Sequence, residues 1–181
     1  MTRVISGTAR GRRLQVPSGL TTRPTADRAR EGLFSSLLSL IELEGARVLD
    51  LYAGSGALGL EALSRGAGSA TFVESDADAV AVLRANVDHL GLPGAFVVAQ
   101  PVERFLTVDA EPRYDLALLD PPYDVDVVPV LKQLRPWLVE GAVVMAERGR
   151  RAPELAWPVG YDPVRSRRYG EATLWYAVAG S

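Results

Sequence analysis

Residues 48–61 read VLDLYAGSGALGLE, and this stretch decides the fold that the sequence predicts. An apolar run ends at Leu51, glycines follow at positions 54, 56 and 59, and a helix-forming segment comes next. Glycines at such a turn let backbone N–H groups approach a ligand without an intervening side chain. The stretch therefore predicts a buried strand, a ligand-binding loop and a helix.

Two carboxylates near the glycine loop help to identify the class of ligand that it binds. Glu74 ends the next apolar run, where a carboxylate can accept hydrogen bonds from ribose hydroxyls. The spacing Gly54-x-Gly56-x-x-Gly59 also fits the dinucleotide fingerprint, so a nicotinamide-dependent oxidoreductase is one hypothesis. However, Asp50 lies just before the loop, where it suits a cationic amino-acid group better than a pyrophosphate, and no residues for hydride transfer are evident.

Apolar runs and helical patterns alternate along the chain. The strands that we expect cover 46–51, 70–74, 95–99, 114–119 and 141–146, and the helices between them cover 57–65, 77–90, 101–107 and 126–138. A further helix should run from 23–25 to about 44–45, and strands near 155–165 and at 172–179 should form an antiparallel hairpin. This alternation predicts an α/β fold with a Rossmann-like sheet, mostly parallel with an antiparallel C-terminal strand.

The N-terminal residues predict a separate unit. Residues 3–6 and 13–16 read as two short strands around a turn with Gly7 and Gly11 at the bend. We therefore expect an N-terminal β-hairpin extension over 1–22, a candidate for RNA binding, followed by one catalytic domain over 23–181.

A second motif, Asp120-Pro121-Pro122-Tyr123, directly follows the strand expected at 114–119. Two prolines hold the backbone rigid, so the loop presents a carboxylate, carbonyl groups and an aromatic ring at the carboxyl end of the strand. The lone pair of an exocyclic base amine is delocalised into the ring, so hydrogen bonds to Asp120 and the Pro121 carbonyl would help to aim it, while Tyr123 stacks on the base. The motif predicts a site for a base taken out of its stack.

The composition excludes several chemistries. The 181 residues contain no cysteine and one histidine, which argues against pyrimidine C5 methylation, a metal site and a histidine-based triad. No apolar run approaches the length of a membrane span, so we expect a soluble protein. The arginine-rich start lacks the apolar core of a secretion signal, and a cytoplasmic location is expected.

Arginines gather at both ends of the chain. The first 30 residues hold seven arginines and one acidic residue, and residues 148–181 hold six arginines and three acidic residues, around an acidic middle. Arginine matches phosphate oxygens, so the basic ends favour a polyanionic partner. The candidate nucleic-acid contacts are Arg10, Arg12, Arg13, Arg23, Arg28 and Arg30, with Tyr169 as part of a substrate wall. Some are alternatively structural, since Asp27 and Glu31 lie beside Arg28 and Arg30 on one helix.

Beyond the two loops, the chain carries ISGTARGRRL at 5–14, RPTADRAREGLF at 23–34 and RRYGE at 167–171. With these motifs it resembles the bacterial 16S ribosomal RNA guanine-N2 methyltransferase family, the RsmD-like enzymes, over essentially its whole length. The resemblance implies the fold of a class I S-adenosylmethionine-dependent methyltransferase. It also implies N2 methylation of a guanine in 16S rRNA, within the small ribosomal subunit or an assembly intermediate.

The resemblance also implies roles for individual residues. S-adenosyl-L-methionine would contact Asp50, Tyr52, Ala53, Gly54, Ser55, Gly56, Glu74, Ser75, Gln100 and Val102, and the base would lie against Asp120, Pro121, Pro122 and Tyr123. We expect a monomer. Two alternatives stay open: an amino-directed DNA methyltransferase, for which little chain remains to read duplex grooves, and a ribosome-assembly factor with dispensable methylation.

Overall fold

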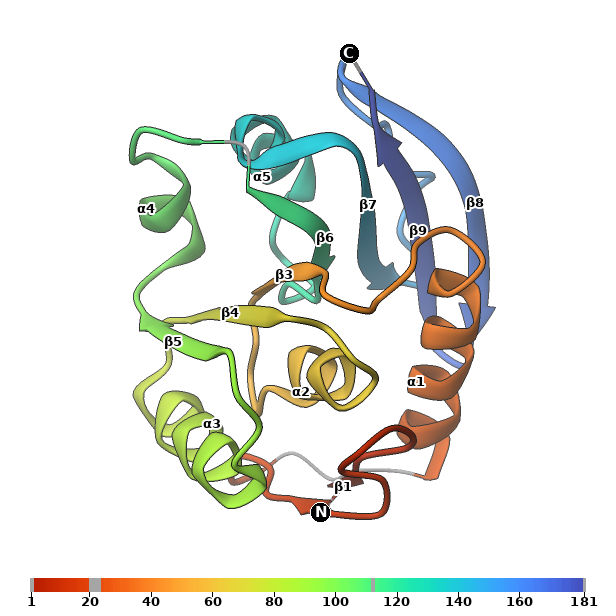
Figure 1. The fold of residues 1–181 in the computed structure, drawn as a ribbon. Helices are drawn as coiled ribbons and strands as arrows, with labels where there is room; N and C mark the ends of the chain where they lie inside the picture. Colours follow the sequence, from red (N-terminus) through yellow and green to blue (C-terminus); the bar gives the residue numbers. More distant parts are fainter. Residues whose placement is uncertain (1, 20–23, 112, 181) are drawn as a thin grey trace.

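The computed structural model describes residues 2–19, 24–111 and 113–180 (Figure 1). Its main sheet has seven strands in the order β5-β4-β3-β6-β7-β9-β8. They are β3 (Arg47–Leu51), β4 (Ser69–Glu74), β5 (Ala95–Ala99), β6 (Tyr114–Leu119), β7 (Leu138–Gly149), β8 (Tyr161–Tyr169) and β9 (Ala172–Ala179). Strands β3 to β7 run parallel, β9 is antiparallel to β7, and β8 is antiparallel to β9. The predicted α/β sheet with its antiparallel C-terminal strand is confirmed.

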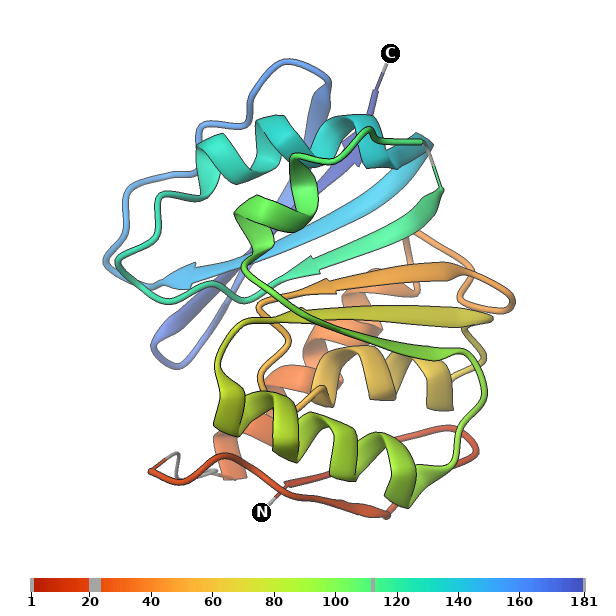
Figure 2. The same ribbon diagram turned by 90° about the vertical axis from the view of Figure 1, so that its left-hand side faces the viewer.

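Helices cover both faces of this sheet (Figures 1 and 2). On one face lie α1 (Pro24–Leu37), α2 (Ala57–Ser64) and α3 (Ala77–Leu90), and on the other lie α4 (Val102–Leu106), α5 (Val127–Leu134) and the short 3-10 helix η1 (Arg135–Trp137). Two hydrophobic cores follow, because a parallel sheet buries both of its faces.

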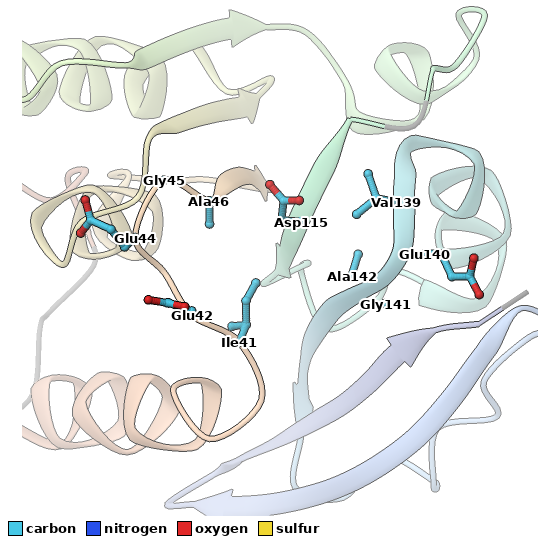
Figure 3. A pocket seen from close by; sticks show the side chains of 10 residues that line it. All are labelled: Ile41, Glu42, Glu44, Gly45, Ala46, Asp115, Val139, Glu140, Gly141 and Ala142. Atoms are coloured by element: carbon cyan, nitrogen blue, oxygen red, sulfur yellow. The ribbon is translucent and has the colours of Figure 1, made fainter.

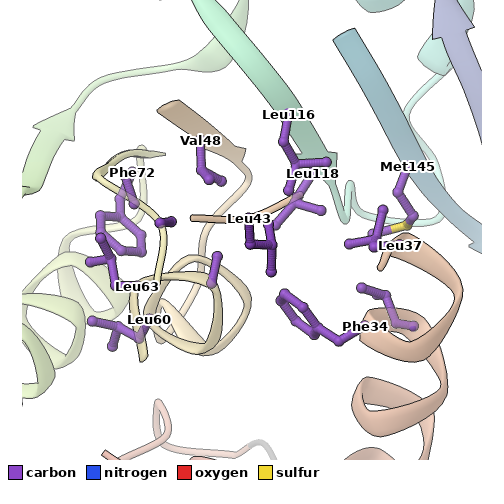
Figure 4. Packing of buried hydrophobic residues seen from close by; sticks show 14 of the residues in the cluster. Phe34, Leu37, Leu43, Val48, Leu60, Leu63, Phe72, Leu116, Leu118 and Met145 are labelled. Carbon is purple, nitrogen blue, oxygen red and sulfur yellow. The ribbon is translucent and has the colours of Figure 1, made fainter. Parts of the chain in front are cut away.

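Alternate side chains of the central strands point to opposite faces of the sheet. Leu116 and Leu118 of β6 and Met145 of β7 pack in one core with Phe34 and Leu37 of α1 (Figure 4). The intervening residues of both strands belong to the other core, beside α4 and α5. This alternation fixes which side chains at the ends of β6 and β7 face α1.

The N-terminal segment packs onto the helices of the first face (Figure 2). Its strands β1 (Thr2–Arg3) and β2 (Arg13–Leu14) form a separate antiparallel pair, shorter than the predicted hairpin. Val4 and Leu14 are buried in the core with α2 and α3. Backbone N–H groups of Ile5 and Ser6 donate to the Glu61 carboxylate of α2 at 2.9 and 3.0 Å.

Three predicted boundaries differ from the structure, each for a local reason. Helix α1 ends at Leu37 and not near 44–45, because the backbone N–H and the hydroxyl of Ser39 both turn back to the Ser36 carbonyl. Helix α5 stops at Leu134, since Pro136 has no N–H with which to continue the helical ladder. Strand β8 starts at Tyr161, after the left-handed Gly160.

In the part of the chain that the structure describes, no helix combines the length and the apolar character needed to cross a membrane.

Candidate active site

The order of the strands places the two sequence motifs side by side. The chain builds β3, β4 and β5 outward in one direction and then returns to place β6 and β7 on the other side of β3. Open α/β sheets bind ligands at the carboxyl ends of the strands where the order reverses. Leu51 at the end of β3 pairs with Leu119 at the end of β6, so the glycine loop and Asp120 are neighbours.

The glycine loop is held in a strained, defined shape. Ala53 N–H donates to the Val73 carbonyl at 3.1 Å. Tyr52 has a φ of 59°, a left-handed conformation that is energetically unfavourable for any residue other than glycine. Gly56 precedes α2 with a φ of 83°, and a Cβ there would lie 2.3 Å from a Leu83 methyl group. Glycine is therefore required at position 56 by backbone conformation and by packing.

Asp50 is a buried carboxylate, and one of its two oxygens accepts a hydrogen bond from the protein. Its Oδ2 accepts the Gly59 N–H at 2.9 Å, whereas its Oδ1 is buried without a hydrogen-bond partner among the described residues. Burial raises the pKa of Asp50 well above its usual range, the Gly59 N–H opposes this shift, and the charges of Asp120 and Glu74 add to it. Such a site favours a cationic ligand, and S-adenosylmethionine carries a sulfonium and an ammonium group.

Glu74 holds the loop from the neighbouring strand. Its Oε2 accepts the Gly54 N–H at 2.8 Å, and its Oε1 accepts the N–H groups of Ser75 and Asp76, each at 2.9 Å. Gly54 itself has open space where a Cβ would stand. The carboxylate thus shapes the loop from the backbone side.

Two cavities open on the α1 face at this end of the sheet. The loop cavity, of about 310 Å³, is lined by Thr2, Val16, Pro17, Ala26, Arg30, Asp50, Tyr52, Ala53, Gly54, Ser55, Ala57, Leu58 and Asp120. The strand cavity, of about 230 Å³, is lined by Ala26, Ala29, Arg30, Leu33, Ala57, Leu58, Asp120, Glu147, Tyr169, Ala172 and Leu174. Asp120 lines both cavities, so it stands where a ligand in one meets a ligand in the other.

Asp120 remains open to solvent through these cavities. Protein packed around its carboxyl group nevertheless raises the pKa of Asp120 to about 6. Its backbone N–H lies 3.4 Å from the Leu51 carbonyl, which ties the start of the DPPY loop to the end of β3. A carboxylate that retains a proton near neutral pH is typical of functional sites.

Glu147 is a site residue that the sequence interpretation missed. It follows Ala146 on β7, the register partner of Leu119, and therefore stands beside Asp120. Burial and the charge of Asp120 raise the pKa of Glu147 to about 8. A signal was present in the sequence, because the inward series Val143, Met145, Glu147 ends in a carboxylate.

The aromatic residues of the predicted base site divide between two places. Tyr169 lines the strand cavity and packs closely on α1, where a Cβ at Gly32 would lie 2.5 Å from its ring. Tyr123 is 80% exposed and lies against Gly149, outside the lining of both cavities. Pro121 and Pro122 connect it to Asp120 and do not line either cavity.

Gln100 and Val102, two of the predicted cofactor contacts, lie beyond the loop cavity. Gln100 is half-buried, and the side chain of Val102 packs in the core beside α4. The Tyr52 hydroxyl donates to Glu103 of α4 at 2.9 Å, which links this segment to the glycine loop. Val102 thus has a packing role in addition to any contact that its backbone makes.

The predicted phosphate-binding arginines differ in their surroundings. Arg10, Arg13 and Arg28 are exposed, the Arg12 guanidinium donates to the His89 carbonyl, and Arg23 lies outside the described residues. Arg30 is 6% exposed, pairs with Asp27 at 3.1 Å, and has its Nε 3.6 Å from Glu61. Of the two interpretations given for Arg30, phosphate contact or structural residue, its burial and pairing support the structural one.

A larger hollow of about 410 Å³ opens at the opposite end of the strands (Figure 3). The acidic residues in its lining are Glu42, Glu44, Asp115 and Glu140, and Asp115 already binds Arg47 through two guanidinium hydrogen bonds of 3.0 and 3.2 Å. Carboxylates repel a polyanion, so this end disfavours nucleic acid. The two sequence motifs lie at the other end, where the strands have their carboxyl ends.

A glycine loop after the first central strand, a buried aspartate before it and a DPPY loop on the adjacent strand define a class I methyltransferase. The family model described as "Conserved hypothetical protein 95" matches residues 2–178, and the chain belongs to this family, that of the RsmD-like enzymes. The resemblance inferred from the motifs is confirmed.

Individual relatives agree with this assignment. "Ribosomal RNA small subunit methyltransferase D" of Escherichia coli strain K12 is 39% identical over 148 residues, 80% of this chain and 73% of that protein. The Haemophilus influenzae protein of the same name is 36% identical over 174 residues, 93% and 89% of the two chains. A solved Escherichia coli structure described as a methyltransferase matches with a TM-score of 0.87 at 34% identity, covering 99% of this chain and 98% of that one.

Proposed function

We propose that this enzyme transfers a methyl group from S-adenosylmethionine to the exocyclic N2 amine of a guanine in 16S ribosomal RNA. Its substrate is the small ribosomal subunit or an assembly intermediate, and it acts as a cytoplasmic monomer. The observation that carries the proposal is the position of Asp120, which lines both the loop cavity and the strand cavity. The names of the two relatives support RNA of the small subunit as the substrate.

The residues around the loop cavity fit the cofactor. The unpartnered Oδ1 of Asp50 and the backbone of Tyr52 to Gly56 would hold its amino-acid part. Glu74, which shapes the loop through the Gly54 N–H, and Ser75 would contact its ribose. When bound, S-adenosylmethionine supplies an electrophilic methyl group. The strained backbone at Tyr52 is fixed before any ligand arrives, so less ordering is required on binding.

The residues around the strand cavity position the base. Asp120 and the Pro121 carbonyl would accept hydrogen bonds from the amine and hold it at the boundary between the two cavities. Tyr169 forms a wall of the strand cavity, and the exposed Tyr123 stands at the outside of the loop, where it can stack on a nucleobase. Placement of the reacting amine is the main catalytic contribution of these residues.

The exposed arginines of the N-terminal segment and α1 would contact the RNA backbone. Arg10, Arg13 and Arg28 present guanidinium groups to solvent, and phosphate contacts position a protein without reading sequence. Their contribution should weaken with added salt, because phosphate binding releases counterions.

The test uses small ribosomal subunits from cells that lack the endogenous enzyme. The protein is incubated with these subunits and S-adenosylmethionine labelled in its methyl group, and the digested RNA is examined for labelled nucleosides. We expect N2-methylguanosine, which the variant Asp120→Ala should fail to produce. Asp124→Ala, which changes an exposed carboxylate in the same loop, should retain activity. Label in DNA, or none in RNA although the cofactor binds, would overturn the proposal.

A further inference from the structure

Two carboxyl groups end the inward-facing rows of β6 and β7. Along β6 this row is Leu116, Leu118 and then Asp120, and along β7 it is Val143, Met145 and then Glu147. The apolar members pack in the core beneath α1 (Figure 4). The two acids that follow line the strand cavity together, so the same face changes from apolar to acidic where the cavity begins.

Placing two ionised carboxylates together is unfavourable unless one takes up a proton or a ligand compensates. In the part of the chain that the structure describes, no salt bridge reaches either acid, and the cation that lines the cavity, Arg30, is paired with Asp27 and Glu61. The rest of the lining includes Tyr169 and apolar side chains such as Leu33 and Leu174. The cavity therefore suits a flat ligand that presents adjacent N–H donors on one edge.

We infer that Glu147 selects guanine by accepting its N1–H, while Asp120 accepts a hydrogen of the neighbouring N2 amine. The inference rests on the proposed function, to which it adds the residue that determines base specificity. Guanine presents N1–H and N2–H₂ side by side on its Watson–Crick edge, and a flipped base is read through this edge. Adenine offers a lone pair at N1 and has no 2-amine, so it cannot satisfy both acids.

The charge state of Glu147 sets the pH range in which this contact forms. The charged or titratable groups that face it are Asp120 after β6, Arg30 on α1 and Tyr169 at the end of β8. Burial and Asp120 raise the pKa of Glu147 to about 8, so an empty site holds Glu147 mostly protonated at neutral pH. The N1–H of guanine favours the ionised acceptor, and methylation should therefore increase as the pH rises through this range.

The experiment compares guanosine with 2,6-diaminopurine at the methylated position. This analogue keeps the 2-amine but has a lone pair at N1. Above the raised pKa of Glu147 this lone pair faces an ionised carboxylate in the wild-type enzyme, whereas in Glu147→Gln it faces an amide donor. Once the methylated nucleotide has been mapped with the wild-type enzyme, small subunits are reconstituted with 16S rRNA carrying either base there. Values of kcat/KM are measured across the pH range for the wild type, Glu147→Gln and a control on the same strand, the exposed Glu140→Gln.

We expect Glu147→Gln to raise the ratio of diaminopurine to guanosine methylation by about tenfold or more. It should also lose the increase of kcat/KM near the raised pKa of Glu147, while Glu140→Gln behaves as the wild type. An unchanged ratio and pH profile in a Glu147→Gln protein that still binds S-adenosylmethionine would overturn the inference. Failure of the wild-type enzyme to methylate guanosine would instead overturn the proposed function, so the two failures are distinct.

Discussion

Glu61 of α2 and Glu147 of β7 are two glutamates on the same face of the sheet, and they have opposite surroundings. Glu61 is fully buried and is met by Arg65 at 2.8 Å, by Arg30 at 3.6 Å and by the backbone N–H groups of Ile5 and Ser6. Glu147 stands beside a second carboxylate, and both line an open cavity. The protein supplies cationic and N–H partners to Glu61, whereas Glu147 has no ion pair among the described residues and faces a like charge.

The difference separates a structural acid from a functional one. A buried ion that is paired and hydrogen-bonded fixes the packing of the elements that supply its partners, here α1, α2 and the N-terminal segment. A pair of like charges raises the pKa of its members and makes folding less favourable, which is tolerated where function requires it. Substitutions in the Glu61 cluster should therefore lower the stability of the fold. Substitutions of Asp120 or Glu147 should instead change activity without lowering stability.

The largest effect should come from Glu61→Ala. Removing this carboxylate takes the 2.8 Å ion pair from Arg65, one of two carboxylates from the buried Arg30, and the acceptor from two part-buried backbone N–H groups. The free energy of unfolding should therefore fall by about 3–5 kcal/mol. Chemical denaturation followed by circular dichroism measures the change. Glu31→Ala on α1 is the matched control, since Glu31 is exposed, and it should stay within about 0.5 kcal/mol of the wild type. Equal stability of the two variants would show that the Glu61 cluster does not hold the N-terminal segment.

Asp120→Asn, in contrast to Glu61→Ala, should lower activity without lowering stability. Methylation should fall by about 100-fold, the scale expected for a misplaced reactant, while the free energy of unfolding should not decrease, because a like charge is removed. The pKa of Glu147 should also fall from about 8, since part of its elevation is due to Asp120. NMR titration of the Glu147 carboxyl carbon measures this shift, and an unchanged pKa would contradict the proximity of the two acids.

The sequence predicted the two loop motifs of the candidate site, but it did not predict Glu147 as part of that site. Asp50, Gly54 and Asp120 could be predicted because glycine spacing and a proline-locked acid are local patterns, and the strand order brings the two motifs together. Glu147 was missed because a single glutamate near the end of a strand reads as a solvent-exposed residue. Its alternation with Val143 and Met145 indicates an inward position, but its place beside Asp120 follows only from the register of β7 against β6.

The same limit applies to Arg30, for which the sequence left two interpretations open. A helix-borne arginine near a basic N-terminus resembles a phosphate contact, and nothing local reveals that Glu61, thirty-one positions away, lies beneath it. The Glu61 of the sequence motif likewise gave no sign that it would bind the backbone of Ile5 and Ser6. Long-range pairing of charges is set by packing, so it could not be predicted from periodicity.

Arg65→Met, a substitution in the Glu61 cluster, should lower the free energy of unfolding by an intermediate amount. The substitution keeps an aliphatic side chain but removes the 2.8 Å ion pair to Glu61 and the guanidinium that lies 4.8 Å from the centre of the Phe34 ring. Glu61 retains Arg30 and two backbone N–H donors, so the free energy of unfolding should fall by about 1–2 kcal/mol, less than for Glu61→Ala. A loss as large as that of Glu61→Ala would mean that Arg65 alone compensates the acid.

The smallest effect, and the one that depends on pH, should come from Glu147→Gln. The pKa of Glu147 is raised from 4.5 to about 8, so between these values the folded protein retains a proton that the unfolded chain has released. The wild type must therefore lose stability as the pH rises through this window, and the glutamine variant lacks this loss. Above the window the variant should be more stable by up to about 1 kcal/mol, a fraction of the full linkage value because solvent screens the half-buried side chain. Thermal unfolding of both proteins across the window measures the difference. Parallel curves would show that water entering the strand cavity already compensates Glu147, and its selectivity for guanine would then depend on hydrogen-bond geometry alone.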